Sequence, residues 1–483
     1  MPEESLKNKT VKGVGWSAMD SLLGQGVSFM VGLVLARLLS PEEYGTLGLI
    51  TIFITILNSF VDSGFSTAVL RKQSATNDDY NTMFISNFVL SIVMYAILFV
   101  GAPSIASFFD KPELVSLTRV VGLVIIINAL SLTQYTLLSK RLDFKTKTKS
   151  SLIAAVISGI VGITLAYTGY GVWALVWQMI VKQSVYTICL WIYNHWTPTL
   201  AFSIQSFKYM WSFGWKMLVS GLLDTTWSQA YQLVVGKFYS PATLGQYSRS
   251  KEYASILSSN INTIVGRVTL PVLAEIQNDK ERLKSAYRKI IKMTMFITAI
   301  SMLSMGAVAE PLIYCLIGPK WHEAATYLPL ICISMSLYPL HAINLNMLKV
   351  QGRSDLFLVL EIIKKVIAIG PICLGIFVGI YWMVAGSVVT GIIAFFLNSF
   401  YSGKFIGYSS WKQIKDVAPN YGIALTIAAS VFFIKYLPLS NFVILPIQII
   451  IGIIVFFVLC KATKNEEYEA IKTMVLELIK RRK

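Results

Sequence analysis

Charged residues are scarce in this sequence: Asp, Glu, Lys and Arg together make up only 14% of its 483 residues. A soluble globular domain carries about 25%, and even a large soluble fold exposes a wide polar surface. Hydrophobic residues account for 55% of the chain. They recur in runs of about 20 residues, the length that a helix needs to cross roughly 30 Å of hydrocarbon. The composition excludes a soluble enzyme and predicts an all-α integral membrane protein.

Several signatures of enzymes and metalloproteins are also lacking. The five cysteines lie mostly inside apolar runs and form no CxxC or Cys/His spacing, so we expect neither a zinc site nor a disulfide framework. The three histidines stand apart in the sequence, and we assign them no metal or catalytic role. No Walker motif or other nucleotide fingerprint occurs, so ATP is not the expected energy source. We therefore expect no catalytic residue, no metal and no cofactor.

Long apolar segments separated by short polar connectors predict about fourteen transmembrane helices. The eighth segment is too polar to be recognised by hydropathy alone. It is included because the connectors no longer alternate between the two sides of the membrane without it. The predicted spans are residues 14–38, 44–70, 82–106, 115–138, 150–169, 172–194, 209–235, 244–270, 288–309, 323–348, 356–378, 380–402, 417–437 and 441–461.

Lysine and arginine are divided unevenly between the two sets of connectors. The set that includes both termini carries 29 of the 42 cations, the other set carries 6, and 7 lie inside spans. Cytoplasmic loops of membrane proteins are enriched in Lys and Arg, so we expect both termini in the cytoplasm. The net charge of +17 then reflects topology. Nucleic-acid binding is not expected, because no basic patch is interleaved with aromatic residues.

The sequence repeats itself at an offset of about 200 residues: Ser40-Pro41 followed by Gly45 recurs as Ser240-Pro241 followed by Gly245. Proline suits the first position of a helix, where its missing N–H has no partner. Six spans separate the copies, so the repeat is parallel, an arrangement typical of secondary transporters with a substrate site between the halves. We predict two six-helix lobes at residues 1–200 and 201–403, followed by two helices and a cytoplasmic tail at residues 404–483.

Twelve charged residues fall inside the predicted spans. A charge at the bilayer centre costs about 2.5–3.5 kcal/mol, so twelve facing lipid would cost roughly 30–40 kcal/mol. That exceeds a typical folding stability of about 5–15 kcal/mol, so most should line a hydrated interior. The candidate substrate-binding residues are Arg249, Arg267, Lys182, Lys216, Lys364, Lys365 and Asn260. The candidate ion-coupling acids are Asp20, Asp62, Asp224 and Glu361.

The eighth span shows the clearest polar pattern. Arg249 and Arg267 are 18 residues apart, which is five helical turns, so they share one face. The resulting stripe is about 27 Å long and predicts the wall of a water-filled cavity. A helix lying on the membrane surface is the alternative. The other polar residues near this face are Glu252, Tyr253, Asn260 and Thr263.

The acids admit structural interpretations as well. Glu361 can pair with Lys364, one turn later, in a self-neutralised cluster. Asp20 and Asp224 occupy corresponding helices of the two copies. Each is expected either to couple transport to protons or sodium ions or to form a structural ion pair with a nearby cation. Asp62 precedes Ser63-Gly64, which predicts a bend in the second span as an alternative to a coupling role.

Four motifs give the chain a family resemblance: residues 40–45 (SPEEYG), 62–65 (DSGF), 271–273 (PVL) with Gln277 and Asp279, and 318–321 (GPKW). With these motifs the chain resembles bacterial polysaccharide or O-antigen repeat-unit flippases (Wzx-type) of the MATE-like MOP exporter superfamily. The resemblance implies two six-helix bundles in a V, two further helices and a cationic cavity. It also implies a bacterial inner-membrane protein that moves an undecaprenyl-pyrophosphate-linked oligosaccharide from the cytoplasmic to the periplasmic leaflet, without enzymatic activity.

The resemblance implies alternating access in the biosynthesis of O-antigen, exopolysaccharide or capsule. The expected partners are the lipid-linked glycan, the bilayer and a polymerase of the same pathway. A lipid II flippase or a MATE-type ion-coupled exporter is the alternative within the superfamily, although an exporter of organic cations should have an acid-rich cavity. A membrane polysaccharide polymerase or ligase should carry a large periplasmic loop, whereas here the longest, near residues 309–323, is short.

Overall fold

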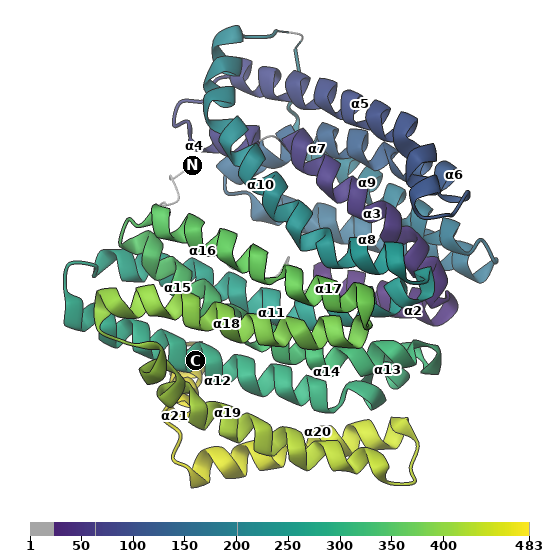
Figure 1. Cartoon of the computed structure of the whole chain (residues 1–483). Helices are drawn as coiled ribbons and strands as arrows, with labels where there is room; N and C mark the ends of the chain where they lie inside the picture. The colour runs from purple at the N-terminus through teal and green to yellow at the C-terminus, as the bar shows by residue number, and fades with distance from the viewer. Residues whose placement is uncertain (1–23, 63, 200, 483) are drawn as a thin grey trace. The chain divides into compact units, whose positions relative to one another are not determined.

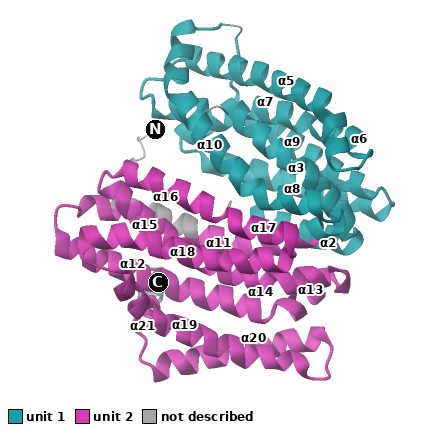
Figure 2. Cartoon of the chain, in the orientation of Figure 1, with its two compact units in different colours: residues 1–245 teal, residues 246–483 magenta. Residues whose placement is uncertain are grey.

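The computed structural model describes residues 24–482 except 63 and 200. The described residues form helices joined by short connectors, with no β-strand among them (Figure 1). The chain divides into two compact units, residues 1–245 and residues 246–483 (Figure 2). The expectation of an all-α protein is confirmed. The predicted lobes at residues 1–200 and 201–403 and the last segment at 404–483 stay predictions.

Unit 1 is built from helices that pack pairwise along their length. Helix α8 packs along α9, α5 along α7, and α10 against α3 and α4. The helices of unit 1 are α2 (Gln25–Leu38), α3 (Pro41–Asp62), α4 (Phe65–Arg71), α5 (Asn77–Phe108), α6 (Leu114–Val121), α7 (Leu123–Lys140), α8 (Phe144–Tyr167), α9 (Val172–Asn194), α10 (Ile204–Phe238) and the first turn of α11 (Pro241–Glu275).

Unit 2 contains the rest of α11 and all later helices. Helix α12 packs along α19 and α14, and its buried Tyr287, Ile291 and Met295 form a core with α15 and α18. The helices are α12 (Lys280–Ala307), α13 (Ala309–Ile317), η2 (Pro319–Trp321), α14 (His322–Ser336), α15 (Tyr338–Val350), α16 (Ser354–Ile367), α17 (Ile369–Phe377), α18 (Ile380–Ile406), α19 (Ser410–Phe432), η3 (Phe433–Tyr436), α20 (Asn441–Ala462) and α21 (Glu466–Arg482).

Short polar side chains begin several of these helices. Thr76 and Asp79 form a capping box at α5, and the carboxylates of Asp143 and Asp279 accept backbone N–H bonds at the start of α8 and α12. Each satisfies donors that the first helical turn leaves without a partner. The residues next to each helix therefore determine where the helix begins.

The bend expected in the second predicted span is confirmed. Helix α3 ends at Asp62, and α4 starts at Phe65 after Gly64, whose φ of 70° is left-handed. Glycine adopts this conformation without the steric penalty of a Cβ atom. The tenth and eleventh predicted spans are also divided, into α14 and α15 and into α16 and α17. Among the described helices, α13 and η2 in the connector at residues 309–323 and α21 in the tail were not predicted.

The two copies of the Ser-Pro repeat contact each other through their glycines. A Cβ atom on Gly45 would lie 1.6 Å from the Pro241 carbonyl oxygen, and one on Gly245 would lie 2.0 Å from the Pro41 carbonyl oxygen. Real Cβ atoms do not approach a backbone oxygen this closely, so both positions require glycine. The first turns of α3 and α11 thus pack against each other. The two copies of the motif that repeats in the sequence are therefore in contact in the structure.

Candidate functional site

Helices that are too polar for ordinary membrane spans carry most of the predicted site. In the described part of the chain, ten helical segments are long and apolar enough to cross a membrane. Helices α10, α11 and α16–α17 do not qualify, and α2 is apolar but shorter. Lys216 and Asp224 lie on α10, Arg249, Asn260 and Arg267 on α11, and Glu361, Lys364 and Lys365 on α16. The predicted count of fourteen spans therefore stays a prediction.

Arg249 is a buried cation on α11 with an acid of its own helix beside it. Its Nη1 atom donates to the Glu252 carboxylate at 2.6 Å. The Arg249 side chain is only 10% exposed, whereas that of Glu252 is 52% exposed. The guanidinium group carries five N–H donors in a planar fork that matches the oxygens of an anion. Arg249 is therefore chemically suited to bind phosphate oxygens.

The backbone of α14 and η2 holds α11 in register near Arg249. The Gln246 side chain donates to the Lys320 carbonyl at 2.8 Å and accepts from the Ala324 N–H at 3.0 Å. Ser250 donates to the Ala324 carbonyl at 2.7 Å. These buried contacts involve the 318–321 motif, whose Trp321 is fully buried. Sequence analysis missed Gln246 and Ser250 as positioning residues, because their partners lie more than 70 residues away.

Asn260 and Arg267 are the other two predicted binding residues on α11. The Asn260 amide donates to the Ile256 carbonyl of the same helix at 2.8 Å. Arg267 lies within α11, but its side chain is outside the described part of the structure. The water-filled wall predicted for this stripe stays a prediction.

Helix α16 brings a predicted acid and a predicted cation together. Lys364 and Glu361 form an ion pair with 2.5 Å between Nζ and Oε1. The intrahelical pair expected from their spacing is confirmed. Lys365 follows on the same helix and is half-buried. The roles expected for this trio, a self-neutralised cluster or a substrate contact, stay predictions.

The predicted site residues of unit 1 lie in different surroundings. The Lys182 ammonium on α9 donates to the Ser28 hydroxyl on α2 at 3.1 Å. Asp62 accepts from Ser66 at 2.6 Å, across the break between α3 and α4. Lys216 is exposed on α10, with its ammonium 6.0 Å from the Trp215 ring centroid, and Asp224 is exposed on the same helix. Asp20 lies outside the described residues.

Unit 1 also contains an amide cluster that sequence analysis missed. Asn128 on α7 donates through Nδ2 to the side-chain Oδ1 of Asn58 on α3 at 3.1 Å, and its own Oδ1 accepts from Gln183 on α9 at 3.2 Å. Gln183 also approaches the Ser131 hydroxyl at 3.4 Å. Amides both donate and accept, which is the chemistry that sugar hydroxyls require. Only the packing of three helices, and no local pattern, reveals this cluster.

Metal-ion chemistry has no candidate site in the described part of the chain. Its residues contain no group of three or more His, Cys, Asp or Glu side chains that could hold a metal ion. The candidate binding groups are cations and amides. Arg249 and Lys364 are chemically suited to anions, and Asn58, Asn128 and Gln183 are suited to hydroxyl groups.

Comparison with known proteins connects this fold with glycan export. A family model described as "Polysaccharide biosynthesis protein" matches residues 34–326. The succinoglycan biosynthesis transport protein ExoT of Rhizobium meliloti is 26% identical, covering 76% of this chain and 74% of its own. The lipopolysaccharide biosynthesis protein WzxC of Escherichia coli is 23% identical, covering 85% of this chain and 84% of its own.

Solved structures share the fold. The lipid II flippase MurJ in an inward closed conformation matches with a TM-score of 0.73 at 16% identity, over 94% of this chain and 98% of its own. An inward-facing MATE family multidrug resistance transporter matches with a TM-score of 0.60 at 16% identity, over 81% of this chain and 98% of its own. The expectation of a MATE-like membrane fold is confirmed.

Proposed function

We propose that this chain, which belongs to the family of polysaccharide biosynthesis proteins, is a flippase for undecaprenyl-pyrophosphate-linked oligosaccharide repeat units. The glycan head group moves from the cytoplasmic to the periplasmic leaflet of the bacterial inner membrane, with both termini of the protein in the cytoplasm. The curated relatives support the glycan part of the proposal, since their names place them in succinoglycan and lipopolysaccharide biosynthesis.

Buried Arg249 is the observation that most directly supports a pyrophosphate-bearing substrate. An arginine inside a membrane protein is costly unless a function or an acid retains it. Glu252 is half-exposed and contacts one guanidinium nitrogen of Arg249. Arginine binds phosphate oxygens in forked geometry, which favours an anionic head group over a cationic drug.

The proposed mechanism is alternating access between the two predicted lobes. The diphosphate binds Arg249, Arg267 and Lys182, with Lys216, Lys364, Lys365 and Asn260 as further contacts. The polyprenyl tail stays in the bilayer, because transferring so long an apolar chain into water is unfavourable. A proton or sodium gradient acting through Asp20, Asp62, Asp224 or Glu361 supplies the energy. A polymerase of the same pathway is the proposed downstream partner.

Reconstitution into vesicles tests this proposal. A fluorescent undecaprenyl-pyrophosphate-linked oligosaccharide is placed in one leaflet, and its appearance in the other is followed with a membrane-impermeant quencher. We expect transport by the natural protein and loss of transport in the Arg249→Gln, Arg267→Gln double variant, while insertion and thermal stability are retained. Transport retained in the double variant would remove the proposed roles of both arginines.

The same vesicles distinguish the glycan from the peptidoglycan precursor. Lipid II carries the same polyprenyl pyrophosphate, so both substrates offer Arg249 the same anion. We expect the oligosaccharide to be moved and lipid II to be moved poorly. Efficient transport of lipid II alone would replace the proposed substrate and leave the flippase mechanism in place.

A further inference from the structure

A charged cavity of about 350 Å³ lies where the tail helix α21 meets α12. It belongs to unit 2 and is separate from the residues proposed for transport. Three cations and one hydroxyl of α12 face two acids of the first turn of α21. The lining residues used below are Ser285, Arg288, Lys289, Lys292, Glu466 and Glu467.

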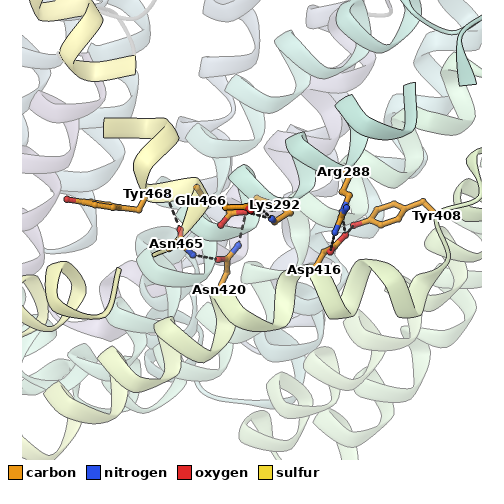
Figure 3. Close-up of polar contacts among 9 residues, drawn as sticks. Arg288, Lys292, Tyr408, Asp416, Asn420, Asn465, Glu466 and Tyr468 are labelled. Atoms are coloured by element: carbon orange, nitrogen blue, oxygen red, sulfur yellow. Dashed lines mark hydrogen bonds and ion pairs between the residues drawn. The ribbon is translucent and has the colours of Figure 1, made fainter. Parts of the chain in front are cut away.

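Helix α21 is attached at this place by buried polar contacts (Figure 3). Asn465 Nδ2 donates to Asn420 Oδ1 at 3.0 Å, and Asn465 Oδ1 accepts from the Tyr468 backbone N–H at 2.9 Å. Asn420 in turn donates to the Lys292 carbonyl at 3.3 Å. A side chain that caps α21 thus also binds the helix pair α12 and α19, so the wall of the cavity is a built feature.

Two acids of different exposure share one ammonium group in this cavity. Lys292 lies 2.9 Å from both Glu466 and Glu467. The Glu467 side chain is 7% exposed, whereas that of Glu466 is 84% exposed. Glu467 is therefore the structural partner of Lys292. Glu466 is held at the solvent edge, where its contact is weak and exchangeable.

Two further cations of α12 line the cavity beside Lys292. Arg288 binds Asp416 through Nε and Nη2, each at 2.5 Å, yet its side chain remains 55% exposed (Figure 3). Lys289 is exposed beside it, and the Ser285 hydroxyl lies one turn earlier on α12. Arginine, lysine and hydroxyl donors together suit the oxygens of a phosphate group.

We propose that this cavity is a binding site for a phosphate group, which takes the place of Glu466 beside Lys292 and is also bound by Arg288, Lys289 and Ser285. The charge asymmetry of the connectors puts this end of α12 on the side predicted to be cytoplasmic. Anionic headgroups of the cytoplasmic leaflet attract basic segments there, so a phospholipid is one source of the phosphate. A soluble phosphate compound is the other.

Binding measurements on the purified full-length protein test the site with two probes. In one arm, fluorescent phosphatidylglycerol is titrated into protein in phosphatidylcholine nanodiscs. In the other arm, inorganic phosphate is titrated by calorimetry. We expect Lys289→Gln to weaken binding about fivefold, since a cation near an anionic surface contributes ~1 kcal/mol. We expect Glu466→Gln to strengthen binding, because it removes the internal competitor.

The two variants are expected to change affinity in opposite directions, and the assay measures binding instead of transport. The test is therefore independent of folding and of the proposed transport function. Unfolding would lower the apparent affinity, so tighter binding by Glu466→Gln cannot be attributed to loss of folded protein. Glu469→Gln is the matched control, since Glu469 lies on the same helix but pairs with Lys472. If the variants change the affinity for phosphatidylglycerol alone, the ligand is a lipid. If they change the affinity for inorganic phosphate, the ligand is a soluble phosphate compound. If Lys289→Gln and Glu466→Gln change neither affinity, the proposal is wrong.

Discussion

Gly45 and Gly245 hold equivalent positions in the two copies of the repeat, and each lies against the proline that opens the other copy's helix. We expect Gly45→Ala and Gly245→Ala each to destabilise the protein by about 1–3 kcal/mol, as overpacking does. The clashing atoms are backbone carbonyl oxygens, which cannot rotate away. Thermal unfolding in detergent measures the effect.

Gly101→Ala is the control for these glycine substitutions. Gly101 lies inside α5 with no atom within 4 Å of its added Cβ. Alanine in an open helical position is about 0.5–1 kcal/mol better than glycine. Equal melting temperatures for Gly45→Ala and Gly101→Ala would contradict the close contact.

Arg249 either binds the substrate anion or serves as the ion-pair partner of Glu252. Substitutions of Arg249 and of Glu252 distinguish these two roles. If it binds the substrate anion, Arg249→Gln should lower transport at least tenfold, whereas Glu252→Gln should leave most transport intact. The expectation follows because a charge-assisted hydrogen bond contributes about 1.5–3 kcal/mol. Initial transport rates in vesicles provide the measurement. Equal losses in the two variants would show that Arg249 serves only to pair with Glu252.

The amide cluster of unit 1 should contribute to stability through Asn128. The Asn128→Leu substitution keeps the number and branching of side-chain heavy atoms but removes the hydrogen-bond partner of Asn58 and Gln183. Leaving such groups without a partner costs about 1–3 kcal/mol. Thermal unfolding should show this loss, whereas Thr55→Val should show little, because the Thr55 hydroxyl is exposed and bonds within α3. No difference between the two variants would mean that the cluster is solvated.

The contact between α21 and α12 should depend on acid pH. The hydrogen bond and charge of Lys292 hold the pKa of Glu466 below its ordinary value of 4.5. Because this pKa is lowered, ionised Glu466 stabilises the docked helix at any pH above its ordinary pKa. The stabilisation is lost as the pH falls through the lowered pKa. A spin label at Thr473 should therefore keep its mobility from pH 8 to about pH 5 and become more mobile below pH 4.5.

Glu466→Gln is the reference for this pH dependence. The glutamine cannot ionise, so its variant lacks the contribution at every pH and should show a smaller change in label mobility. The same acid-induced change in both proteins would assign the pH dependence to another group.

Much of the fold could be predicted because hydropathy and charge act locally. Apolar runs indicated helices throughout the chain, and Gly64 indicated the break between α3 and α4. Helix α21 was missed because it is too polar for a membrane span and depends on contacts such as that of Asn465 with Asn420. Its position is decided by tertiary packing, which a single sequence does not display.

The candidate site was predictable only where its contacts lie within one helix. The pair Glu361–Lys364 follows from spacing alone, and so does the proximity of Arg249 to Glu252. The amide cluster joins Asn58 to Asn128 across 70 residues, and the support of α11 by Lys320 spans 74. Such partners become visible only when helices distant in sequence are packed together.

The boundary between the two units falls inside α11, between Gly245 and Gln246, and not in a loop. A loop absorbs rotation at a few dihedral angles, whereas an unbroken helix distributes bending over several turns of hydrogen bonds. The unbroken helix that follows Gly245 carries Arg249, four residues farther along. If Arg249 binds the substrate as proposed, any bending of α11 at this place would move a substrate contact directly.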